Sequence, residues 1–122
     1  MFDRKIEADL VAWKQRPDRK PLVLRGARQT GKTTLIRKFA AGFETFVELN
    51  LEKDHVRKIF SEVKDIKDVV QIIEGVSNQR VIPGKTLLFI DEIQNSVSAI
   101  KLLRFFHEEM PQLHVISAGS LL

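Results

Sequence analysis

The sequence predicts an α/β fold, in which a parallel β-sheet carries helices on both faces as a three-layer sandwich. Short apolar runs at 21–25 and 86–90 are typical of strands that are buried on both sides. Segments with apolar residues at helical spacing alternate with such runs. The first strand also passes into a helix through a glycine-containing phosphate-loop pattern. These three observations together favour parallel strands joined by helices.

The chain begins with a predicted helix at 3–15, within a leading segment 1–16. Ile6, Leu10 and Trp13 fall at positions i, i+4 and i+7, so they share one face, on which Trp13 is expected to pack. The proline that follows at position 17 ends the helix.

A strand at 21–25, a loop at 26–33 and a helix at 32–41 come next. Gly42 is the expected C-cap of this helix, because glycine adopts left-handed backbone angles without a steric penalty. The segment 22–42 is therefore a strand–loop–helix unit.

The middle of the chain continues with a predicted strand at 43–51. Two helices at 53–60 and 65–76 follow, each with apolar residues at helical spacing.

The last segment, 86–122, contains the buried strand 86–90, a helix at 97–109 and a strand at 113–118. The sequence stops directly after that strand, where an α/β sheet normally continues into a covering helix. We therefore expect 1–122 to be the N-terminal part of a larger domain.

The composition is that of a soluble globular protein. Of the 122 residues, 43% are hydrophobic and 30% are charged, and no apolar run approaches the roughly 20 residues that span a bilayer. The amino terminus lacks the layout of a secretory signal, and the absence of cysteine excludes disulfide and thiolate chemistry. We expect a cytoplasmic protein with no membrane partner.

The net charge of +4 is unevenly distributed along the chain. Residues 1–42 contain 11 basic and 4 acidic side chains, whereas 43–122 contain 9 basic and 12 acidic ones. A nucleic acid is compatible with this asymmetry, but no recognition helix or interleaved aromatic pattern supports it. A solvated surface beside a nucleotide pocket explains the charges more simply.

Residues 26–33 form a complete phosphate-loop motif, Gly-Ala-Arg-Gln-Thr-Gly-Lys-Thr. Gly26 and Gly31 let the backbone turn tightly and direct N–H groups toward an anion. Lys32 can reach the β- and γ-phosphates of ATP and act in catalysis, and the Thr33 hydroxyl can bind Mg²⁺. The predicted nucleotide-binding residues are Gly26, Ala27, Arg28, Gln29, Thr30, Gly31, Lys32, Thr33 and Thr34.

An acidic pair, Asp91 and Glu92, directly follows the strand at 86–90. In P-loop ATPases an acidic residue at such a strand end holds magnesium beside the phosphate loop. Asp91 is predicted to hold Mg²⁺ through water, and Glu92 to position the water that attacks the γ-phosphate. Such a pair can also cap a helix, but next to a phosphate loop it predicts ATP hydrolysis.

With both motifs placed, the sequence resembles prokaryotic AAA-type P-loop ATPases. The resemblance rests on Arg-Gly-Ala-Arg-Gln-Thr-Gly-Lys-Thr-Thr-Leu at 25–35, Asp-Glu-Ile-Gln at 91–94 and Gly-Ser at 119–120. It implies an additional-strand sheet, with the strand before Asp91 between the second strand and the last one. The last strand is then expected beside the phosphate-loop strand.

The resemblance also implies a polar sensor that contacts the γ-phosphate or the attacking water. Ser120 occupies the matching position and joins Lys32 and Glu92 as a predicted catalytic residue. Ser117 is the alternative, and either could be an ordinary strand-end serine. An arginine finger and a second sensor would come from a missing carboxy-terminal region or a neighbouring subunit. We therefore expect this chain to bind ATP and Mg²⁺ but to hydrolyse ATP slowly.

Other polar residues have competing interpretations. Arg28 could reach a phosphate or an acidic neighbour, or it could face solvent. Gln94 could relay the nucleotide state to the adjoining helix, although plain polarity at a helix start is the more general explanation. The three histidines lack metal-ligand spacing, so we predict no metal but Mg²⁺. The leading hypothesis is a nucleotide-driven switch in a larger protein; the alternatives are a nucleic-acid-binding module and a non-catalytic nucleotide-binding scaffold.

Overall fold

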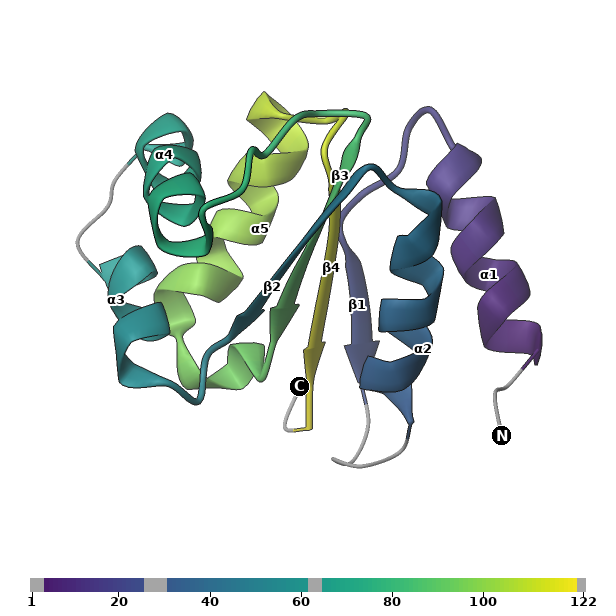
Figure 1. Cartoon of the computed structure of the whole chain (residues 1–122), viewed down its shortest axis with the longest axis horizontal. Helices are drawn as coiled ribbons and strands as arrows, with labels where there is room; N and C mark the ends of the chain where they lie inside the picture. Colours follow the sequence, from purple (N-terminus) through teal and green to yellow (C-terminus); the bar gives the residue numbers. More distant parts are fainter. Residues whose placement is uncertain (1–3, 26–30, 62–64, 121–122) are drawn as a thin grey trace.

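The structure is a computed structural model that describes residues 4–25, 31–61 and 65–120 (Figure 1). Its elements in chain order are α1 (Arg4–Gln15), β1 (Leu22–Arg25), α2 (Lys32–Phe39), the 3₁₀ turn η1 (Ala40–Gly42), β2 (Thr45–Asn50), α3 (Asp54–Ser61), α4 (Ile66–Ser77), β3 (Thr86–Asp91), the 3₁₀ turn η2 (Ile93–Asn95), α5 (Val97–Glu109) and β4 (His114–Gly119). Each predicted helix and strand is present, with described bounds within two residues of the expected ones.

The four strands form one parallel sheet in the order β1-β4-β3-β2. This order confirms the arrangement implied by the resemblance, since β3 lies between β2 and β4 and β4 lies beside β1. In a parallel sheet every strand ends at the same edge. The carboxyl ends of β1, β3 and β4 therefore meet at one edge of the molecule.

Helices cover both faces of the sheet, with α1 and α2 on one side and α3, α4 and α5 on the other (Figure 1). Along β3, Leu87 and Phe89 join the core under α1 and α2, whereas Leu88 and Ile90 join the core under the other three helices. Successive side chains of a strand point to opposite faces, so a strand buried on both faces is apolar throughout. Trp13 lies in the first of these cores, which confirms its predicted packing role.

None of the helices in the described part of the chain is long and apolar enough to span a membrane.

The end of α2 differs from the prediction, because Gly42 is not its C-cap. The helix tightens into η1, where the Phe43 N–H donates to the Ala40 carbonyl at 3.0 Å, and Ala40 is the capping residue. Gly42 instead receives a hydrogen bond on its carbonyl from Lys14 Nζ at 2.8 Å. A Cβ at position 42 would lie 3.1 Å from that ammonium. A side chain at position 42 would therefore require the Lys14 ammonium to shift by a few tenths of an ångström.

His114 joins the start of β4 to α1 and to the connection between α1 and β1. Its Nδ1 lies 3.2 Å from Arg19 Nη2, and its Nε2 lies 3.1 Å from the Lys14 carbonyl oxygen. A guanidinium only donates and a carbonyl only accepts, so the imidazole is neutral with its proton on Nε2. Burial of the ring lowers the pKa of His114, and the nearby positive charges of Arg19 and Lys14 lower it further.

We expect the free energy of unfolding to fall as the pH drops below the ordinary histidine pKa of 6.5. Below that pH the unfolded chain binds a proton at His114 more readily than the folded chain does. The contribution of neutral His114 to stability is therefore fully present above pH 6.5, and it is lost as the pH falls toward the lowered pKa of the folded state. Urea unfolding at about pH 7.5 and about pH 5.5 measures the difference.

The variant His114→Gln should reduce this pH dependence, whereas His55→Gln, at an exposed position on α3, should retain it. An undiminished loss of stability in His114→Gln would contradict the assignment.

Candidate functional site

The candidate site lies at the carboxyl edge of the sheet. Arg25 at the end of β1 is opposite Gly119 of β4, and Asn50 at the end of β2 is opposite Asp91 of β3. Ser120 directly follows Gly119. The parallel register therefore brings Asp91, Ser120 and the end of the phosphate-loop strand to one edge, as the sequence predicts.

The amino end of α2 lacks a side-chain cap among the described residues. Its N-cap is Gly31, whose positive φ of 83° suits glycine, and the first turn of α2 contains no acidic residue. By contrast, α4 and α5 are capped by the side chains of Asp65 and Ser96. The first N–H groups of a helix need an acceptor, and its positive dipole end favours an anion. This end of α2 is therefore suited to a phosphate group.

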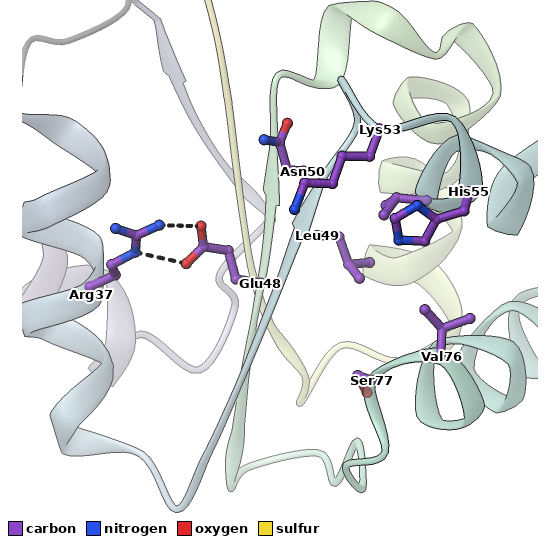
Figure 2. Close-up of a pocket in the computed structure, with 9 residues that line it drawn as sticks. Arg37, Glu48, Leu49, Asn50, Lys53, His55, Val76 and Ser77 are labelled. Atoms are coloured by element: carbon purple, nitrogen blue, oxygen red, sulfur yellow. Dashed lines mark hydrogen bonds and ion pairs between the residues drawn. The ribbon is translucent and has the colours of Figure 1, made fainter.

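An ion pair fixes α2 against β2 (Figure 2). Arg37, one helical turn after Thr33, donates from Nε and Nη2 to the two carboxylate oxygens of Glu48 at 2.9 and 2.7 Å. Paired hydrogen bonds of this kind define the orientation of both side chains. The pair lines a pocket of about 450 Å³ that Asn50, Lys53 and His55 also line. No motif in the sequence predicts this contact, although Arg37 is on the same side of α2 as Thr33.

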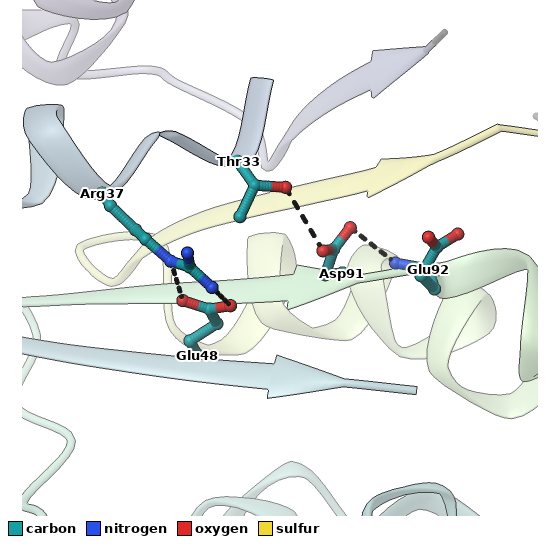
Figure 3. A network of polar contacts seen from close by, with 5 residues as sticks. All are labelled: Thr33, Arg37, Glu48, Asp91 and Glu92. Carbon is teal, nitrogen blue, oxygen red and sulfur yellow. Dashed lines mark hydrogen bonds and ion pairs between the residues drawn. The ribbon is translucent and has the colours of Figure 1, made fainter. Parts of the chain in front are cut away.

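The contact nearest the predicted chemistry joins α2 to β3 (Figure 3). Thr33 Oγ1 lies 3.5 Å from Asp91 Oδ2, a long hydrogen bond, and the other Asp91 oxygen accepts the Glu92 N–H at 2.9 Å. Burial is the main cause that raises the pKa of Asp91, and the charges of Glu92 and Glu48 raise it further. The Glu92 N–H and the Thr33 hydroxyl act in the opposite direction.

A hydroxyl and a carboxylate side by side match the oxygen ligands that Mg²⁺ prefers. Within the described residues no group of three or more histidine, aspartate or glutamate side chains could hold a metal alone. Mg²⁺ is commonly held by one or two protein oxygens together with substrate phosphates and water. The donor set of Thr33 and Asp91 therefore fits Mg²⁺ bound with a nucleotide.

Glu92 has an unusual backbone conformation at the end of β3. Its φ is 54°, in the left-handed region, and the residue is only 8% exposed. Such a conformation at a non-glycine residue costs on the order of 1–3 kcal/mol and persists only where the surroundings fix it. The side-chain amide and main-chain N–H of Asn95 both donate to the Glu92 carbonyl, at 3.0 and 3.1 Å. Gln94 Nε2 donates to Glu92 Oε1 at 2.8 Å.

The described part of the phosphate loop begins at Gly31. Lys32 and Thr33 are half-buried, and Thr34 is exposed. The predicted nucleotide contacts of Gly26, Ala27, Arg28, Gln29 and Thr30 lie outside the described residues.

The two candidate sensor serines occupy different environments. Ser117 is fully buried within β4, and its hydroxyl donates to the Leu22 carbonyl of β1 at 3.5 Å. Ser120 is half-buried and follows the end of β4. Of the two, Ser120 is therefore the one beyond the sheet edge, on the side where Asp91 lies.

A family model described as an AAA domain matches residues 18–122. The matched range runs from the residues before β1 to the end of the chain, so it includes the phosphate loop, the acidic pair and both serines. A search of the curated proteins finds no match.

We expect Asp91→Asn to raise the melting temperature of the nucleotide-free protein at neutral pH. The raised pKa means that the ionised carboxylate is disfavoured in the folded state above its ordinary pKa, and asparagine removes that charge with little change in shape. Thermal unfolding at about pH 7.5 measures the effect. Asp9→Asn, at an exposed position on α1, should change the melting temperature little. A lower melting temperature for Asp91→Asn than for the wild type would contradict the electrostatic account.

Proposed function

The chain belongs to the AAA domain family, and on that premise we propose that it binds ATP with Mg²⁺ and hydrolyses the ATP. The observation that carries the proposal is the 3.5 Å contact between the Thr33 hydroxyl and the Asp91 carboxylate, 58 residues apart in sequence. It supports a site where the amino end of α2, which has no side-chain cap among the described residues, and the acidic end of β3 act on the same ligand.

The phosphates bind at the amino end of α2. The N–H groups of the first turn of α2 and the Lys32 ammonium create a positive potential at this end of the helix. The negative charges of the β- and γ-phosphates of ATP neutralise that potential. The share of Gly26, Ala27, Arg28, Gln29 and Thr30 in this binding is proposed from their sequence motif.

Thr33 and Asp91 are the residues that would hold Mg²⁺. When bound, Mg²⁺ neutralises negative charge on the β- and γ-phosphate oxygens. Before the ion binds, the half-buried Asp91 carboxylate has, among the described residues, the Glu92 N–H and the long Thr33 bond as its hydrogen-bond partners. A cation therefore favours the ionised carboxylate that burial disfavours.

Glu92 and Ser120 are the residues proposed to act at the γ-phosphate. Glu92 orients the attacking water and accepts its proton, and Ser120 contacts the water or the γ-phosphate as a polar sensor. Since Glu92 begins the η2–α5 connection, a change at the γ-phosphate reaches α5 through it. This link supports a nucleotide-driven switch.

ATP with Mg²⁺ should raise the melting temperature of the wild type. Ligand at 100 times its Kd stabilises the folded state by about 2.7 kcal/mol, which is several degrees for a domain of this size. Lys32→Ala should abolish most of the shift, because it removes the cation at the phosphates. Lys101→Ala, at an exposed position on α5, should preserve it. The absence of any shift in the wild type at millimolar nucleotide would refute ATP binding.

Phosphate release should fall by at least about 100-fold in Glu92→Gln, because the amide cannot accept the proton of the attacking water. The ATP-induced shift in melting temperature should persist in this variant. Glu109→Gln, exposed at the end of α5, is the matched control and should release phosphate at the wild-type rate. Equal release by Glu92→Gln and the wild type would favour a scaffold or another catalytic group over the proposed role.

A further inference from the structure

Glu92 is fixed at its main chain and at its carboxylate by two different residues. Asn95 binds the Glu92 carbonyl oxygen with its side-chain amide at 3.0 Å. Gln94 instead binds the carboxylate, through Nε2 and Oε1 at 2.8 Å. The contact with Gln94 is thus the one that acts on the group proposed to orient water.

The orientation of the Gln94 amide follows from the chemistry of its partner. A carboxylate only accepts hydrogen bonds, so the amide must present its nitrogen to Glu92 and direct its oxygen elsewhere. That oxygen, Oε1, is buried and accepts no hydrogen bond from any residue that the structure describes. Burial of an unpaired carbonyl oxygen is unfavourable, whereas a hydrogen bond to a charged group is stronger than a neutral one. The bond to Glu92 therefore fixes the Gln94 amide and the Glu92 carboxylate relative to each other.

Gln94 is not needed to begin α5. The helix is capped by Ser96, whose Oγ accepts the Ala99 N–H at 3.1 Å. The η2 turn before it is closed by main-chain bonds from Asn95 to Glu92 and from Ser96 to Ile93. Plain polarity at a helix start therefore does not explain the place of the Gln94 side chain.

We propose that Gln94 is a positioning residue that holds the Glu92 carboxylate in one orientation for ATP hydrolysis. The proposal rests on the proposed function and deepens it. A glutamate side chain has three rotatable bonds, and the left-handed backbone fixes only where it starts. The charge-assisted hydrogen bond from Gln94 restricts the rotation of the Glu92 side chain, so the carboxylate already has the orientation in which it binds the attacking water.

Steady-state phosphate release by Gln94→Ala, Gln94→Glu and a control tests this role. Gln94→Ala should lower kcat by about 10- to 100-fold, the range typical of a misplaced catalytic group, with KM for ATP within about 2-fold. Gln94→Glu keeps the length but replaces the donor by an acceptor that repels Glu92, so it should not restore kcat. Gln71→Ala, the same change at an exposed position on α4, should retain the wild-type kcat.

Two results would overturn the proposal. One is an unchanged kcat in Gln94→Ala. The other is a kcat that falls together with ATP affinity and melting temperature, as a merely structural role predicts.

If the wild type binds ATP but releases no phosphate, the proposed hydrolysis is wrong independently of Gln94. NMR then tests the hydrogen bond between Gln94 and Glu92. The carboxyl ¹³C resonance of Glu92, assigned by its loss in Glu92→Gln, should then move in Gln94→Ala and stay in place in Gln71→Ala. An unmoved resonance in Gln94→Ala overturns the inference.

Discussion

The interior position of β3 is the constraint on which the rest of the structure depends. The strand is hydrogen-bonded on both sides, and its residues from Thr86 to Ile90 are fully buried. Each large apolar side chain buried there contributes about 1.5–3 kcal/mol, so the register against β2 and β4 is strongly specified. Phe89 also shares a core with Ile36 of α2. The same packing that holds the sheet together therefore places Asp91 beside Thr33.

The buried histidine at the amino edge of this sheet has its hydrogen-bond partners, whereas polar groups at the carboxyl edge are in unfavourable environments. At the amino edge, both ring nitrogens of His114 have partners, and the neutral ring completes the packing of α1. At the carboxyl edge, Asp91 has a raised pKa, Glu92 has a left-handed backbone and, within 4–25, 31–61 and 65–120, no side chain caps the start of α2. These features lower the stability of the nucleotide-free protein, and proteins retain such features where a ligand or a reaction uses them.

Most of the fold was predictable because burial governs it. Apolar periodicity located α5 and the interior strands, and the phosphate-loop and acidic motifs pointed to Thr33 and Asp91. No sequence pattern predicts the positive φ of Glu92, since glutamate rarely adopts this conformation. The contact between Glu92 and Gln94 depends on that conformation, so it was not predictable either. Arg37 meets Glu48 only through the packing of α2 on the sheet. Gly42 was misassigned as a C-cap because α2 tightens into the 3₁₀ turn η1 and is capped by Ala40 before it reaches the glycine.

Paramagnetic relaxation by Mn²⁺, used in place of Mg²⁺ with a non-hydrolysable ATP analogue, tests the central claim most directly. Both ions prefer oxygen ligands, and Mn²⁺ broadens the amide resonances nearest to it. We expect the strongest broadening at Thr33 and Asp91, dependent on nucleotide and absent from α4. Broadening centred away from these two residues, or indifferent to nucleotide, would contradict a metal–nucleotide site at the carboxyl edge.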